Sequence, residues 1–114
     1  MLPAAARLTR SQDFGLVVRR GRRAGRPRLV VHALTPDVPT LETASKVGFV
    51  VSKAVGNSVV RHRVSRRLRH VVGARLADFP TGTSLVVRAL PAAATATSAE
   101  LAADFESAVR RLQR

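Results

Sequence analysis

The residues with the clearest chemical potential are arginines that crowd one short segment. Residues 56–69 read GNSVVRHRVSRRLR, and five of these positions are arginines. A guanidinium group donates two hydrogen bonds to phosphate oxygens and stacks on nucleobases, so clustered arginines are typical of nucleic-acid binding. We expect these side chains to position phosphates rather than to cleave them. The segment therefore predicts a binding surface for nucleic acid.

Residues able to catalyse a reaction or to hold a metal do not form a recognisable set. The chain has no cysteine, which excludes disulfides and thiolate metal sites. His62 and His70 are eight residues apart, beyond the i, i+4 spacing of two metal ligands on one helix. The carboxylates Asp13, Glu42 and Asp78 lie singly, and no nucleophile has a base beside it. We therefore expect no catalytic residue and no metal ion bound by the protein itself.

The overall charge indicates a polyanionic partner. Twenty lysines and arginines stand against seven acids in 114 residues, which leaves a formal net charge of +13. Repulsion of that size is relieved when a polyanion binds. Hydrophobic residues make up 46% of the chain, so it can form a core. The sequence has no apolar run that could cross a bilayer, no signal-peptide pattern and no basic amphipathic anchor, so we expect a cytoplasmic protein that binds no membrane.

Hydrophobic periodicity and turn residues predict six helices and strands in a single domain that spans residues 1–114. In chain order they are a helix, two strands, a helix, a strand and a helix, at 11–20, 28–35, 46–52, 58–77, 83–89 and 98–112. The basic stretch 22–27 reads as a connector that could be partly extended, and 36–45 reads as a loop. The order α-β-β-α-β-α predicts a two-layer α+β sandwich.

The predicted helix 58–77 has a buried side and a cationic side. At about 100° per residue, one side collects Val60, Val64, Leu68, Val71, Val72 and Leu76. The other side collects His62, Arg63, Arg66, Arg69 and His70. No acidic residue lies between Lys46 and Arg75, whereas an ordinary solvated helix face mixes charges of both signs. Arg61 falls toward the buried side, where its long side chain could pass the helix start and join Lys53 over the sheet edge.

A longer motif surrounds the start of this helix. Residues 52–69 read SKAVGNSVVRHRVSRRLR. This segment resembles the signature of the bacterial ribonuclease P protein component, whose pattern is close to S-K-K-x-G-N-A-V-x-R-N-R-x-K-R-x-x-R. Similar segments follow the family's order at 9–14, 47–52 and 87–93. The resemblance therefore covers most of the chain.

The resemblance implies a subunit of a ribonucleoprotein enzyme. The family's protein is the accessory subunit of ribonuclease P, an endoribonuclease that removes the 5′ leader from precursor tRNA. The catalyst is the large RNA, which uses Mg²⁺. The arginine helix docks on that RNA, a cleft between the first helix and the sheet holds the single-stranded leader, and the protein is a monomer within the complex. The implied fold is similar to the split βαβ folds of ribosomal proteins and has a left-handed β-α-β crossover, an exception to the usual right-handed rule.

Candidate RNA-binding residues follow from the positions that match the motif or the cleft. They are Phe14, His32, Lys53, Asn57, Arg61, His62, Arg63, Arg66, Arg67 and Arg69. From helical spacing alone, Phe14 is better explained as core, like Phe49, Phe79 and Phe105, and only the resemblance assigns it to the leader cleft.

Several positions depart from the family's pattern. Ala54 and Ser65 stand where lysines are usual, and His62 replaces an asparagine. Val18 and His32 stand where aromatic residues of the cleft are common, so we expect weaker stacking of the leader. Arg67, where the family often has an apolar residue, would partly restore the charge that faces the RNA.

The residues alone leave two other classes of function open. One is a structural RNA-binding protein such as a ribosomal protein, and the other is a DNA-compacting protein. Neither class has a reason to carry a G-N-x-V-x-R-x-R unit directly between a strand and a helix, with Phe14 upstream. That unit therefore favours the ribonuclease P interpretation.

Overall fold

The computed structural model describes residues 6–8, 10–36 and 45–113, so most of the predicted loop 36–45 lies outside the described residues. The helices are α1 (Ser11–Arg20), α2 (Ser58–Gly73) and α3 (Ser98–Leu112), and the strands are β1 (Arg22–Gly25), β2 (Leu29–Leu34), β3 (Lys46–Val50) and β4 (Ser84–Ala89). Two short 3-10 helices follow α2 and β4, at η2 (Leu76–Asp78) and η3 (Pro91–Thr95). The α+β class is confirmed.

Two details of the sequence-based assignment differ from the structure. The helix predicted over 58–77 ends at Gly73, and a turn and η2 take its last residues. The connector 22–27 contains a strand, β1, because its backbone pairs with β2 in the antiparallel register Arg23↔His32 and Ala24↔Val31. Only Ala24 of this strand is buried. Its sequence RRAG therefore shows no clear apolar alternation, which is the usual signal for a strand.

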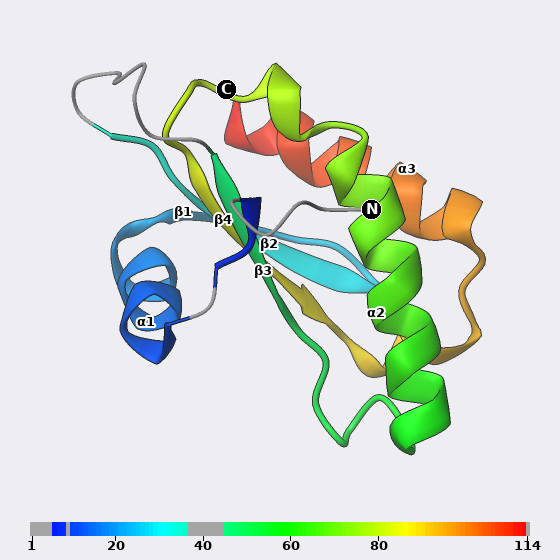
Figure 1. The fold of residues 1–114 in the computed structure, drawn as a ribbon. Coiled ribbons are helices and arrows are strands. Elements are labelled where there is room, and N and C mark those ends of the chain that lie inside the picture. The colour runs from blue at the N-terminus through cyan, green and yellow to red at the C-terminus, as the bar shows by residue number, and fades with distance from the viewer. Residues whose placement is uncertain (1–5, 9, 37–44, 114) are drawn as a thin grey trace.

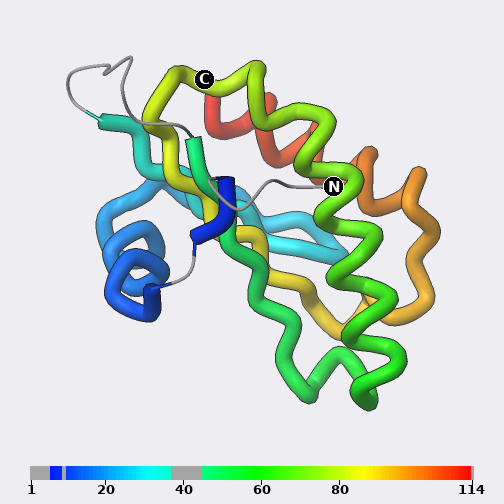
Figure 2. The backbone as a smooth tube through the Cα atoms, in the orientation of Figure 1, coloured from blue at the N-terminus to red at the C-terminus, as the bar shows by residue number. Residues whose placement is uncertain are grey.

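The four strands form one mixed sheet in the order β1-β2-β4-β3. β2 pairs antiparallel with β1 and β4, while β3 pairs parallel with β4 along the edge. Parallel neighbours need a crossover connection, and α2 provides it. Figure 2 follows this path from β3 into α2 and back through η2 to β4. The left-handedness implied by the resemblance stays a prediction.

Helices cover both faces of the sheet, but unequally. Figure 1 shows α2 and α3 on one face and α1 on the other. Strand residues alternate between the faces, and those fully buried in the core shared with α2 and α3 include Leu29, Val31, Leu85 and Val87. A smaller cluster on the α1 face holds Leu8, Val17 and Val86. Because α1 has only ten residues, it leaves part of its face of the sheet open.

Candidate nucleic-acid interface

The motif around Gly56 first serves to start α2. The side-chain Oδ1 of Asn57 accepts a hydrogen bond from the backbone N–H of Val60 at 3.0 Å, which caps the helix. A Cβ atom at position 56 would lie 2.8 Å from a Cγ atom of Val60, so only glycine fits there without displacement. The cap and the close approach fix where the helix begins, and hence which way each arginine points.

The faces of α2 follow the pattern in the sequence, except that Arg63, expected on the outward side, and Val60, expected on the buried side, are each half-buried. Val64, Leu68 and Val72 have no exposed surface, and Val71 is also buried. The outward side carries the exposed residues His62, Arg66, Arg69 and His70. This row contains no acidic side chain, so it presents uncompensated positive charge.

Three arginines of α2 are only half exposed and make closer contacts with the protein. Arg63 donates to the carbonyl oxygen of Ala94 at 3.2 Å, and Arg67 donates to that of Ala96 at 2.6 Å. These bonds tie α2 to η3 and the residue after it. Each guanidinium has five N–H donors, so both keep donors for a ligand. The buried Nε of Arg61 has no hydrogen-bond partner among the described residues, in keeping with its predicted position toward the core.

A groove of about 380 Å³ lies on the part of the sheet that α1 leaves open. His32 of β2 lies within it, with Arg23 of β1 as its direct cross-strand neighbour. Arg88 of β4, paired with Val30, stands on the same face. Val18 of α1 forms part of the wall. The groove thus combines two guanidiniums, an imidazole and an aliphatic side chain.

Arg23 and Arg88 were missing from the sequence-based set of candidates. Arg88 could have been found, because alternation in the strand 83–89 puts it on the same face as Val86 and opposite Leu85 and Val87. Arg23 could not, because its strand had no recognisable pattern and its place depends on pairing with His32.

The surroundings of His32 favour the neutral form of its imidazole. Burial lowers its pKa from the ordinary value of 6.5, and the positive charges of Arg23 and Arg88 lower it further. Its Nδ1 atom is buried without a hydrogen-bond partner among the described residues. A neutral imidazole offers one donor and one acceptor, which suits contact with a polar ring.

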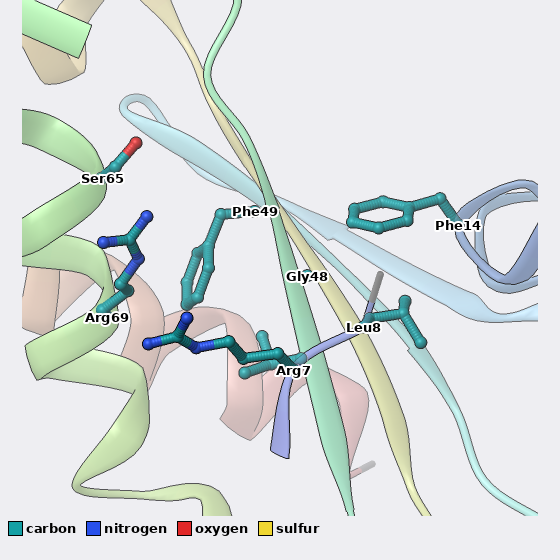
Figure 3. A pocket seen from close by; sticks show the side chains of 8 residues that line it. Arg7, Leu8, Phe14, Gly48, Phe49, Ser65 and Arg69 are labelled. Carbon is teal, nitrogen blue, oxygen red and sulfur yellow. The ribbon is translucent and has the colours of Figure 1, made fainter. Parts of the chain in front are cut away.

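Phe14 does not share this groove. Its ring lies against Gly48 of β3, where a Cβ atom would come within 2.2 Å of its Cζ atom, and it lines a separate pocket (Figure 3). It is half-buried and also packs on the Leu8–Val17 cluster. Lys53 is exposed in the turn after β3, between two residues that line the groove. The predicted cleft residues are therefore split between two sites.

The acidic side chains that form ion pairs in the described part of the chain contact arginines outside these surfaces. The ion pairs of the described residues join Arg28 to Glu100 at 2.8 Å and to Asp104 at 3.3 Å, and Arg75 to Asp78 at 2.7 Å and to Glu106. No cation of α2 or of the groove has an acidic partner in the described part of the chain. Within the same ranges, no three histidines or carboxylates gather as a metal site, and no helix is long and apolar enough to cross a membrane.

Similarity to known proteins extends over nearly the whole chain. The family model named Ribonuclease P matches residues 2–113. This chain belongs to the ribonuclease P protein family. A ribonuclease P protein component from Streptomyces griseus is 55% identical, over 98% of this chain and 95% of the relative. One from Corynebacterium diphtheriae is 50% identical, over 100% of this chain and 98% of the relative.

Solved ribonuclease P proteins share the fold. The protein from Staphylococcus aureus superposes with a TM-score of 0.79 at 20% identity, covering 93% of this chain and 94% of that one. The protein from Thermotoga maritima gives a TM-score of 0.75 at 19% identity, covering 92% and 96%. Family membership makes the chain the protein subunit of an endoribonuclease of tRNA processing, with an RNA partner.

Proposed function

We propose that the chain assembles with the catalytic RNA of ribonuclease P through α2 and holds the single-stranded 5′ leader of precursor tRNA in the groove beside α1. The observation that carries this proposal is the segregation of charge. The acidic residues that form ion pairs pair with Arg28 and Arg75. The cations of α2 and the groove have no acidic partner among the described residues. Phosphates are the partners that such surfaces bind.

Two surfaces suit two kinds of RNA. The convex outward side of α2, with Arg66 and Arg69 exposed, fits the backbone of a folded RNA. The groove is concave and presents Arg23 and Arg88 for phosphates, with His32 and Val18 for bases. Single-stranded RNA is bound by this combination of cations and ring contacts. Because Val18 and His32 are smaller than phenylalanine or tyrosine, base stacking in this groove should be weak.

Catalysis belongs to the RNA in this proposal. The described residues hold no cluster of histidines and carboxylates that could bind a metal ion. Mg²⁺ bound by the RNA supplies the charge stabilisation for phosphodiester hydrolysis. The protein binds and orients RNA as one copy in a cytoplasmic complex.

Reconstitution with the catalytic RNA at low Mg²⁺ tests the proposal. Adding the protein should raise the cleavage rate of precursor tRNA that carries a leader, because contacts between the groove and the leader strengthen substrate binding. The gain should fall when the leader is shortened to one nucleotide. Equal cleavage with and without protein would refute the proposal.

A variant on α2 tests the docking surface separately. Arg66→Ala should weaken binding to the catalytic RNA. It should also reduce the slope of log K against log salt concentration by about one, because one phosphate contact is lost. Arg111→Ala, which alters an exposed arginine at the end of α3, is the matched control. If Arg66→Ala bound as tightly as the unaltered protein across the titration, α2 would not be the docking surface.

A further inference from the structure

A second pocket lies at the outer edge of β3, away from the groove. It has a volume of about 210 Å³ and is lined by Arg7, Phe49, Ser65 and Arg69, together with Leu8, Phe14, Val47 and Gly48. Figure 3 shows Arg7, Phe49, Ser65 and Arg69 on the α2 side of β3, and Phe14 and Leu8 on the α1 side. Three parts of the chain meet here: the segment before α1, the edge strand and the middle of α2.

Two arginines from distant parts of the sequence converge on this pocket. Arg7 and Arg69 both reach toward the ring of Phe49 (Figure 3). Both are exposed, and the guanidinium of neither has a hydrogen bond or ion pair to any other described residue. Like charges that share a pocket repel, and an anion placed between them relieves that repulsion.

The pocket also offers a ring and free backbone groups. Phe49 is only half-buried, so part of its ring faces the pocket. The segment 6–8 pairs with β3 at Val47, whose carbonyl oxygen accepts from Leu8 at 2.9 Å. Alternate residues of a strand direct their backbone groups to the same edge, so those of Phe49 also point outward. No described residue bonds to them on that edge.

We propose that this pocket binds one unstacked nucleobase of the catalytic RNA, with Arg7 and Arg69 on its flanking phosphates. Unstacked bases of RNA loops usually stack on aromatic rings or on guanidinium planes of proteins. Backbone groups can form hydrogen bonds with the edge of such a base. The volume is below the roughly 300–1,000 Å³ of ordinary ligand pockets, which suits a single ring system. This proposal rests on α2 as the surface that docks on the RNA.

The place of the pocket distinguishes its ligand from the leader. The two arginines, Ser65 and Phe49 lie on the α2 side of β3, and only Leu8 and Phe14 lie on the α1 side, which is the side of the groove. An RNA that follows the outward row of α2 reaches Arg69 directly, because Arg66 and Arg69 are neighbours on the helix. The bound base therefore belongs to the RNA subunit.

The test compares variants that close the pocket with variants that remove its charge. Ser65→Leu fills the pocket from α2, and leucine also has the higher helix propensity, so folding should be retained. Ser65→Leu and Phe49→Leu should each weaken binding to the catalytic RNA by about tenfold, which is the scale of one lost stacking contact. The slope of log K against log salt concentration should not change.

The charge variants should act on that slope. Arg69→Gln and Arg7→Gln should each reduce it by about one. Arg110→Gln, exposed on α3 and outside both pockets, should change neither quantity.

Binding is measured with the RNA alone and then with RNA bound to precursor tRNA that has or lacks a leader. The losses should be the same in all three cases. A loss seen only with the leader would assign the pocket to the substrate and overturn the proposal. If Ser65→Leu and Phe49→Leu bound normally while Arg66→Ala did not, the pocket would be empty in the complex although α2 docks. If Arg66→Ala also bound normally, the docking surface itself would be wrong.

Discussion

Gly48 and Phe14 form a close contact on the α1 face of the sheet. The ring occupies the space where a side chain at position 48 would begin, at 2.2 Å from an ideal Cβ atom. Gly48 therefore lets α1 approach the edge strand, and this contact holds Phe14 against β3 and away from the groove. The role of Phe14 as a leader contact stays a prediction, and its packing role is what the described contacts support.

Gly48→Ala should lower the free energy of unfolding by about 1–3 kcal/mol, because the added methyl group overpacks this contact. Urea unfolding measures the change. Gly25→Ala is the matched control, since a Cβ atom there meets nothing within 4 Å. The loss should shrink in a Phe14→Leu background, and equal effects at positions 25 and 48 would refute the assigned contact.

His32 should make stability depend on pH. Its pKa is lowered in the folded protein, chiefly by burial and then by Arg23 and Arg88, so the unfolded chain takes up a proton at higher pH than the folded one. The free energy of unfolding should therefore fall as the pH drops below about 6.5, and the fall should end once the pH is below the folded pKa.

Unfolding by urea between about pH 8 and pH 5 tests this dependence. His32→Gln should remove this component of the pH profile. Arg88→Gln should raise the pKa of His32, as followed by NMR titration, because it removes a nearby positive charge. A His32 that titrates at or above 6.5 would show that the groove does not hold a neutral imidazole.

At the scale of elements, the caps decide where the helices begin. Asn57 caps α2, although Ser58 beside it is also a residue type that caps helices. Thr97 caps α3 in a reciprocal capping box with Glu100, and Ser98 beside it is likewise a possible cap by type. The backbone conformation decides which of the two neighbours takes the role.

Asn57→Ala should lower the free energy of unfolding by about 1 kcal/mol, the usual value of a helix cap. Ser58→Ala should have little effect, since the side chain of Ser58 makes no cap bond. Thermal unfolding of the two variants compares them directly. A larger loss for Ser58→Ala would mean that the helix starts one residue later.

At the scale of the whole molecule, the position of the charges matters more than their sum. The net charge of +13 would attract any polyanion. Three of the four described ion pairs, however, join α3 to Arg28 or Arg75, the fourth joins Arg75 to Asp78, and none involves α2 or the groove. The molecule therefore has distinct cationic surfaces.

Two double variants with the same loss of charge test this point. Arg66→Gln with Arg69→Gln should weaken RNA binding strongly and reduce the salt dependence by about two ions. Arg110→Gln with Arg111→Gln, at the exposed end of α3, should leave both nearly unchanged. Filter binding over a range of salt concentrations measures the difference. Equal losses would mean that net charge alone governs binding.

The sequence by itself determined the α+β class, which side of α2 is buried, and the row of cations on its other side. These features depend on the 3.6-residue period of the helix and on the turn before it, and residues close together in the sequence determine both. The family resemblance extended these local patterns to a function, and the similarity to known ribonuclease P proteins confirms the family and the role as its protein subunit.

Only the tertiary structure decided which distant residues meet. β1 exists because its backbone pairs with β2, and that pairing brings Arg23 beside His32. Arg63 and Arg67, expected to face the RNA, reach back to carbonyl groups near η3. Arg7 meets Arg69 because segment 6–8 pairs with the β3 edge. Contacts between residues far apart in the chain leave no period in the sequence, so both pockets became visible only in the fold.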